Sequence, residues 1–249
     1  MNQDHRANMK NWKSAWSRLR PGRKEWLLGL TGAYCVISVM MNLLCMKPLS
    51  FGTGFVWMDG GLVISWMVFL ISNVITEAYG KREAIAVAGI ATVVAFAMSI
   101  VGVIEVRLPT LPEYAEQAEH FANIFSNGPR TIISSALAFF IGNVINVEII
   151  DRLRRRAARR RNDNAARFTG RAVFSTVVGQ FVDNGLFQTL AFAPVGLSVY
   201  EMRMVDIATA VATGTIIETV IEGCFVGLVT IPLTRFLLSL PREDAPCAR

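Results

Sequence analysis

The chain has 249 residues, of which 53% are hydrophobic and 18% are charged, and its net charge is +6 at neutral pH. This combination is typical of a membrane protein with basic loops. The four cysteines show no paired spacing, and both histidines, His5 and His120, lie outside the apolar segments. A metal site in the membrane therefore lacks its usual ligands, and no serine has a histidine partner at membrane depth. The absence of a GxxxxGKS/T loop also argues against ATP hydrolysis by that route.

The amino-terminal tail and six apolar segments divide the chain. In residues 1–25, Trp12, Trp16 and Leu19 lie among Lys and Arg, which predicts an amphipathic helix at the membrane surface. The apolar segments are residues 26–46, 61–79, 84–106, 130–150, 172–193 and 206–238. Most have about 20 residues, enough for a helix to cross about 30 Å of hydrocarbon. The short alternating segments of a β-barrel are absent.

These segments predict an all-α, polytopic membrane protein with six transmembrane helices in a domain spanning residues 26–240. The first segment follows a basic stretch and lacks a small-residue cleavage site, so we expect a retained helix. The last segment is too long for one straight crossing and either bends at its glycines and Pro232 or begins in the interface. Residues 107–129 form either a short amphipathic helix or a plain connection, and residues 241–249 form a second tail.

The basic residues indicate the orientation. Only four of the 25 Lys and Arg residues, namely Lys47, Arg107, Arg130 and Arg203, fall on one side of the predicted membrane. By the positive-inside rule both termini are then cytoplasmic. The arginine-rich stretch 152–171 has the density of a phosphate-binding segment. Its place between two spans is explained by topology and anionic lipid, so we expect membrane lipid and no nucleic acid as a partner.

A pattern of small, polar, apolar, apolar and polar residues recurs in four of the six segments. The copies are Ser72-Asn73-Val74-Ile75-Thr76-Glu77, Gly142-Asn143-Val144-Ile145-Asn146, Gly179-Gln180-Phe181-Val182-Asp183-Asn184 and Gly214-Thr215-Ile216-Ile217-Glu218, the last followed by Glu222. Polar positions three residues apart share a helix face, and the small residue permits close helix approach. A mid-membrane carboxylate costs about 2.5–3.5 kcal/mol for insertion, so Asp183 and Glu218 must face a polar interior.

These polar residues either join the helices or bind a solute. Packing explains Asn73 and Asn143 well, because amides bond across membrane helices. It explains the carboxylates poorly, because the central parts of the spans carry no Lys or Arg. Glu77 lies near a predicted cytoplasmic end and is either a solvated charge or part of the site. The candidate substrate-binding residues are Asp183, Gln180, Asn184, Asn143, Asn146, Asn73, Glu77, Glu218 and Glu222. Their chemistry fits a small polar, aromatic or cationic solute.

Two motifs resemble those of a known family. NVITEAYGKREA, residues 73–84, and GQFVDNGLFQTLAF, residues 179–192, are similar to the second-helix and fifth-helix motifs of the queuosine precursor transporters, a six-helix family. FIGNVINVEIIDRLRR, residues 140–155, matches the fourth-helix pattern more loosely. The resemblance extends over residues 26–240. Several relatives have a Lys ten residues before the sixth-helix Pro, whereas this chain has Glu222 before Pro232.

The resemblance implies a bacterial inner-membrane importer of 7-cyano-7-deazaguanine or 7-aminomethyl-7-deazaguanine for queuosine synthesis in transfer RNA. It implies a secondary transporter rather than an enzyme, with no cofactor, and leaves a homodimer open. The family's polar motif positions correspond to Glu77, Gln180 and Asp183. We expect Asp183 to bind the base's N–H edge, and Gln180 and Asn143 to orient its ring. Glu77, Glu218 and Glu222 either complete the site or carry a coupling proton.

Three other functions stay open at this point. The chain is alternatively the substrate-binding membrane subunit of an energy-coupling-factor importer for a nucleobase-like or vitamin-like solute, which requires separate ATPase chains. A membrane-embedded enzyme is disfavoured by the missing His and Cys ligands. A structural or assembly subunit predicts that Asp183→Asn changes stability without changing uptake.

Overall fold

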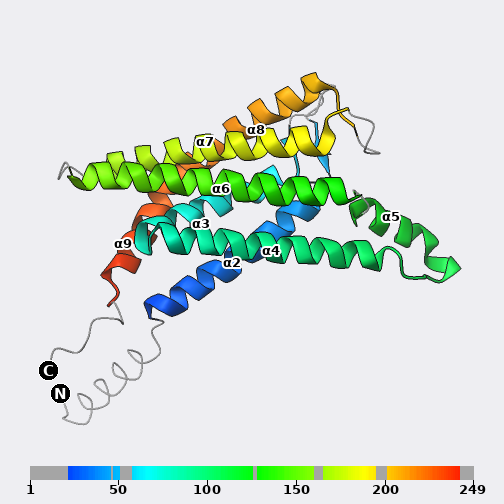
Figure 1. Cartoon of the computed structure of the whole chain (residues 1–249), viewed down its shortest axis with the longest axis horizontal. Helices are drawn as coiled ribbons and strands as arrows, with labels where there is room; N and C mark the ends of the chain where they lie inside the picture. The colour runs from blue at the N-terminus through cyan, green and yellow to red at the C-terminus, as the bar shows by residue number, and fades with distance from the viewer. Residues whose placement is uncertain are drawn as a thin grey trace, which may run out of the picture.

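The computed structural model describes residues 22–45, 47–50, 58–125, 128–159, 165–194 and 201–241. It forms a bundle of long helices that lie side by side along the long axis of the molecule (Figure 1). The tails predicted at residues 1–25 and 241–249 lie outside the described residues, except for residues 22–25 and 241.

Each of the six apolar segments forms a helix, as predicted. The helices are α2 (Arg23–Leu44), α3 (Leu62–Ala78), α4 (Lys81–Glu105), α6 (Gly128–Arg159), α7 (Ala165–Phe192) and α8 (Met204–Phe225), and α8 continues through the π-helical turn η2 (Val226–Thr230) into α9 (Ile231–Ser239). By length and apolar composition, α2, α4, α6 and the α8–α9 rod are each able to cross a membrane. The all-helical class is thus confirmed.

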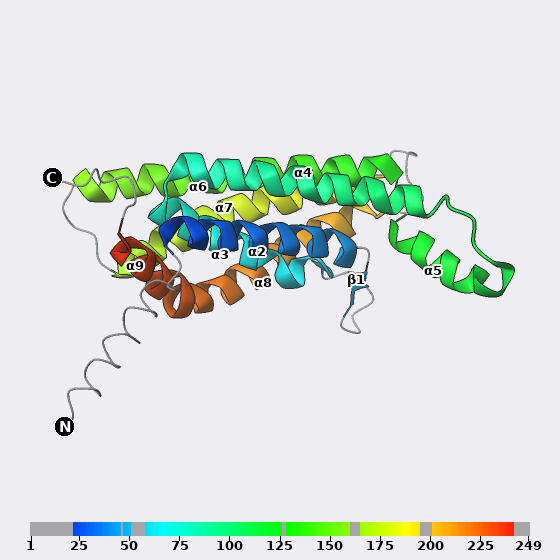
Figure 2. The same ribbon diagram turned by 90° about the horizontal axis from the view of Figure 1, so that it is seen from below.

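The other two apolar helices, α3 and α7, differ from these four in length or in composition. Helix α3 has 17 residues, which is at the short limit for a transmembrane helix. Helix α7 has 28 residues, but Gln180, Asp183, Asn184 and Gln188 interrupt its apolar sequence, and all four are buried. Both helices pack alongside other helices of the bundle (Figure 2), although α7 still exposes Phe174 and Phe181 on its outer face. The polar residues of α7 are buried against neighbouring helices and are therefore kept away from lipid.

Three segments differ from the simplest prediction. Helices α6 and α7 extend into the arginine-rich stretch predicted as a loop, ending at Arg159 and beginning at Ala165. Ala and Arg are strong helix formers, and Arg152 and Arg155 pair with acids one turn earlier in α6. The connection 107–129 contains the helical alternative, as η1 (Pro112–Tyr114) and α5 (Ala115–Phe125).

The third difference is a small β-hairpin before α3, which the all-α prediction lacked. β1 (Pro48–Leu49) pairs antiparallel with β2 (Met58–Asp59), with Leu49 opposite Met58. The hairpin lies at the same end of the bundle as α5, which we call the hairpin end. At the opposite end, which we call the basic end, α3 turns into α4 through Gly80, whose φ of +105° favours glycine.

Helices α6 and α7 approach each other closely through two glycines. A Cβ atom added at Gly142 would lie 2.7 Å from the Asp183 Cβ and 2.9 Å from the Gly179 carbonyl oxygen. One added at Gly179 would lie 2.8 Å from the Asn146 Cβ. The small residues of the repeated pattern therefore permit close helix approach, as the sequence predicted, and they bring the polar residues of α6 and α7 together.

Candidate functional site

Polar side chains from four helices meet in the middle of the bundle. These side chains are almost completely buried and form hydrogen bonds between helices. We call them the amide cluster, which consists of Asn73 on α3, Asn146 on α6, Thr176 and Gln180 on α7, and Glu222 on α8. On α7, residues 176 and 180 are one turn apart, so both face the same neighbours.

Glu222 is the centre of the amide cluster. Its Oε1 atom accepts hydrogen bonds from Asn73 Nδ2 at 3.1 Å and from Thr176 Oγ1 at 2.8 Å, and its Oε2 atom accepts one from Gln180 Nε2 at 3.4 Å. Asn146 Nδ2 donates to Asn73 Oδ1 at 3.0 Å, which adds α6 to the network. The Oδ1 atom of Asn146 is buried and has no hydrogen-bond partner within the described part of the chain. The cluster thus leaves one acceptor available.

A second group of polar residues lies nearer the hairpin end, around a small cavity of about 30 Å³. We call it the acidic cavity. Asp59, Ser65, Asp183 and Asn184 line it together with Asn42, Cys45 and Ser135. Glu218 completes its polar wall, because it accepts hydrogen bonds from Ser65 Oγ and from Asn184 Nδ2, the latter at 2.8 Å. The cavity is large enough for water but too small for a bicyclic base.

Asp183 is the carboxyl group that remains available in this cavity. Its side chain is 7% exposed, and it accepts no hydrogen bond from any residue that the structure describes. Across the cavity Asp59, in the hairpin, accepts hydrogen bonds from the Gly61 and Leu62 backbone N–H groups at 2.9 and 3.3 Å and from Gln188 Nε2 at 2.6 Å. Burial raises the pKa of Asp59 to about 6, although these three donors oppose the shift.

Acidic side chains dominate the electrostatics of the interior. Asp183, Glu218 and Glu222 form no ion pair with Lys, Arg or His among the residues placed by the structure. Only neutral groups donate to Glu218 and Glu222. Uncompensated negative charge away from water is costly, so a cationic or donor-rich solute would be stabilised here. The described residues contain no group of three or more His, Cys, Asp or Glu side chains that fits a metal ion.

Two predicted site residues lie elsewhere. Asn143 is buried against α2, where Tyr34 OH donates to its Oδ1 atom at 2.6 Å, and its Nδ2 atom donates to the Phe139 carbonyl oxygen at 2.9 Å. Glu77 lies at the basic end, where its Oε1 atom is 3.0 Å from Arg171 Nη2 and both side chains are less than a tenth exposed. Asp183 and Asn184 line the acidic cavity, and Asn73, Asn146, Gln180 and Glu222 form the amide cluster.

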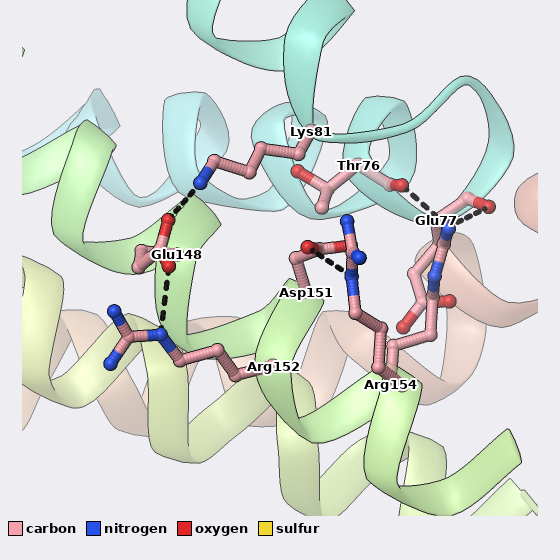
Figure 3. Close-up of polar contacts among 8 residues, drawn as sticks. Thr76, Glu77, Lys81, Glu148, Asp151, Arg152 and Arg154 are labelled. Carbon is pink, nitrogen blue, oxygen red and sulfur yellow. Dashed lines mark hydrogen bonds and ion pairs between the residues drawn. The ribbon is translucent and has the colours of Figure 1, made fainter. Parts of the chain in front are cut away.

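The basic end closes the bundle with charged contacts (Figure 3). Arg154 on α6 donates to the backbone carbonyl oxygens of Thr76 and Glu77 on α3, at 2.9 and 3.0 Å. Glu148 accepts from Lys81 and from Arg152, so it links α4 to α6. These contacts hold the end of α3 against α6. The acidic cavity lies on the other side of the amide cluster, toward the hairpin end.

Several polar residues of the site were missed in the sequence. Asp59 precedes two glycines and an apolar run, which is the pattern of a residue that caps a helix amino terminus. Ser65 lies two turns before Ser72, and Gln188 lies one turn after Asn184, so both continue the polar faces already recognised. Extending the polar patterns of α7 by one turn in both directions would have found Thr176 and Gln188, and extending that of α3 by two turns would have found Ser65.

Long apolar helices around a buried acidic and amide interior define a multi-pass membrane protein of the transporter class. The chain belongs to the family described as "Putative vitamin uptake transporter", whose model matches residues 59–234. The match begins at Asp59 and covers the amide cluster and most of the acidic cavity. Comparison with curated proteins gives no match, and comparison with solved structures gives none either.

Proposed function

We propose that this chain is a secondary transporter that imports a queuosine precursor, a 7-deazaguanine base, across the bacterial inner membrane. In this proposal six helices span the membrane and the basic end faces the cytoplasm, as the positive-inside rule predicts for its arginines. The observation that carries the proposal is the acidic cavity, in which no described residue donates a hydrogen bond to Asp183 and no described Lys, Arg or His pairs with the carboxyl groups of Asp183 and Glu218. The transporter family and the two sequence motifs support the same function.

The chemistry of the solute fits the cavity wall. A 7-deazaguanine presents adjacent N–H donors on one edge, and a carboxylate accepts two parallel hydrogen bonds from such an edge. We assign Asp183 to this role, with Asn184 beside it and Asp59 opposite. The aminomethyl derivative adds a cation, which the uncompensated carboxyl groups would stabilise. Gln180 and the free Oδ1 atom of Asn146 then receive the solute one step further toward the basic end.

Binding requires the helices to separate. Ligand sites for small molecules have volumes of about 300–1,000 Å³, whereas the acidic cavity has about 30 Å³. The closed basic end and the small cavity describe an occluded conformation. The π-helical turn η2 between α8 and α9 and the glycine contact between α6 and α7 are the elements at which movement is expected.

Uptake in cells that cannot make the precursor tests this proposal. Expression of the chain should restore queuosine in transfer RNA at low external precursor, and Asp183→Ala or Asp183→Asn should abolish the rescue while the protein remains folded in the membrane. Asp206→Asn makes the same chemical change outside the cavity, where Asp206 pairs with Arg203, and should retain uptake. Full uptake by folded Asp183→Ala would remove Asp183 from the site.

The family description favours a second solute class, because it names vitamins. The uptake panel should therefore contain the two deazaguanines, guanine, cytosine and a set of vitamins. Copurification of ATPase and scaffold chains would favour an energy-coupling-factor subunit over a secondary transporter. Recovery of chemically unchanged solute from the cells would separate transport from catalysis.

A further inference from the structure

A second cavity, of about 310 Å³, lies at the hairpin end between α2, α4, α5 and α6. It is about ten times larger than the acidic cavity and falls within the range of small-molecule sites. Most of its wall is apolar, and α5 covers it with the aromatic rings of Phe121 and Phe125, whose centroids are 4.6 Å apart. No motif recognised in the sequence accounts for this cavity.

The two cavities are neighbours that share part of their walls. Asn42, Cys45 and Ser135 line both of them. Between the cavities, Ser135 Oγ on α6 donates a hydrogen bond to Asn42 Oδ1 on α2. This hydrogen bond joins the two helices at the point where a solute would pass from the larger cavity into the acidic one.

Helix α5, which covers the larger cavity, packs against a glycine of α4. The ring of Phe125 occupies the position that a Cβ atom at Gly102 of α4 would take. A side chain at residue 102 would therefore displace Phe125. The packing of α5 over the cavity thus depends on residue 102 of α4 being a glycine. Figure 2 shows α5 at this end of the bundle.

From this arrangement we infer that the larger cavity is an outer vestibule, which binds the transported solute before the Asn42–Ser135 hydrogen bond opens to admit it to the acidic cavity. The inference rests on the proposed function and adds a second binding site and a gate to it. Helix α5 is the cover of the vestibule, and its two phenylalanines supply an apolar face for a flat ring.

The lining of the vestibule restricts the chemistry of the solute. Its described lining residues include no Lys, Arg or His, and Glu105 is exposed at its rim. An anionic solute would therefore be disfavoured, whereas a neutral or cationic aromatic heterocycle would be accepted. The rings of Phe121 and Phe125 offer stacking, and the side chains of Asn42 and Ser135 offer both donors and acceptors to its polar edge.

The native Cys45 provides a direct test, because it is a free thiol that lines both cavities. In a variant whose other cysteines, Cys35, Cys224 and Cys247, are replaced by Ser, a membrane-impermeant thiol reagent is added to whole cells. Cys45 reports on the vestibule. The gate is tested in a second variant that carries Met41→Cys and Cys45→Ser, because residue 41 lines the acidic cavity but not the vestibule. In this second variant Asn42→Ala should speed labelling by about fivefold, the factor that corresponds to one lost hydrogen bond. Thr31→Ala is the control, since its hydroxyl bonds within α2 to the Leu27 carbonyl oxygen, away from both cavities.

Solute protection completes the test. Added 7-aminomethyl-7-deazaguanine should slow Cys45 labelling, and should still do so in Asp183→Ala, where uptake is lost but the vestibule is intact. Gly102→Val, which displaces Phe125, should remove the protection. If the chain imports this base but the base never slows labelling and Asn42→Ala labels at the parental rate, the vestibule is refuted. If no solute of the panel is imported, the proposed function fails instead, and the labelling rate of Asn42→Ala still reports whether the gate exists.

Discussion

Acidic side chains have different partners at the basic end of this bundle and in its interior. At the basic end Glu77, Glu148 and Asp151 each have an arginine partner, and Lys81 adds a second cation to Glu148. In the interior toward the hairpin end, Asp183, Glu218 and Glu222 have no cation partner among the described residues. Glu77 and Asp151 are as buried as the interior acids, so burial alone does not explain the difference.

The difference separates structural charge from charge that is available to a solute. An ion pair that is complete in the protein gains little from a further ligand. A carboxyl group that neutral amides alone hold in place still favours a donor or a cation. Sequence motifs group Glu77 with Gln180 and Asp183, yet the structure places Glu77 in the first class and Asp183 in the second. The following variants test this division.

The largest effect is expected from removing one partner of the buried ion pair. Arg171→Met leaves Glu77 buried without its guanidinium partner, which should destabilise the protein by about 3–5 kcal/mol. The double variant Arg171→Met with Glu77→Gln should recover much of this loss, because no uncompensated charge remains. Thermal unfolding in detergent measures both. Equal stability of Arg171→Met and the parent would contradict a structural role for the pair.

A smaller effect is expected at the contact between α6 and α7. Gly179→Ala places a Cβ atom 3.0 Å from the Gly142 carbonyl oxygen as well as against Asn146, so the helices must move apart at a cost of about 1–3 kcal/mol. Gly185→Ala is the matched control, since nothing lies within 4 Å of its added Cβ atom. The melting temperature should fall only for Gly179→Ala, and uptake should fall with it because the Asp183 backbone shifts. A change of equal size in both variants would point to general helix effects.

Much of this architecture follows from the sequence, because apolar runs and polar residues three or four apart are local properties. These patterns predicted six helices and placed Asn73, Gln180 and Glu222 in one site, where hydrogen bonds join them in the structure. The patterns could not predict the hydrogen bond between Asn143 and Tyr34, since it depends on how α2 packs against α6. The vestibule and the opposition of Asp59 to Asp183 were also outside their reach, because both depend on the tertiary position of short connecting segments.

The pH dependence of stability gives the most gradual effect, at most about 1.4 kcal/mol for each pH unit, and probes the carboxyl group of the hairpin. The pKa of Asp59 rises to about 6 in the folded protein from a usual value of 3.8, so the folded state holds this proton more tightly. The stability that the proton contributes is complete below about pH 4 and is lost as the pH rises to about 6, by at most about 1.4 kcal/mol per pH unit.

Asn also caps helices well, so Asp59→Asn should keep the start of α3 while it removes this titration. Melting temperatures between pH 4 and pH 7 should therefore fall less steeply for Asp59→Asn than for the parent. Parallel profiles for the parent and Asp59→Asn would mean that Asp59 is not a protonated member of the cavity wall, and that the carboxyl groups on α7 and α8 alone define its chemistry.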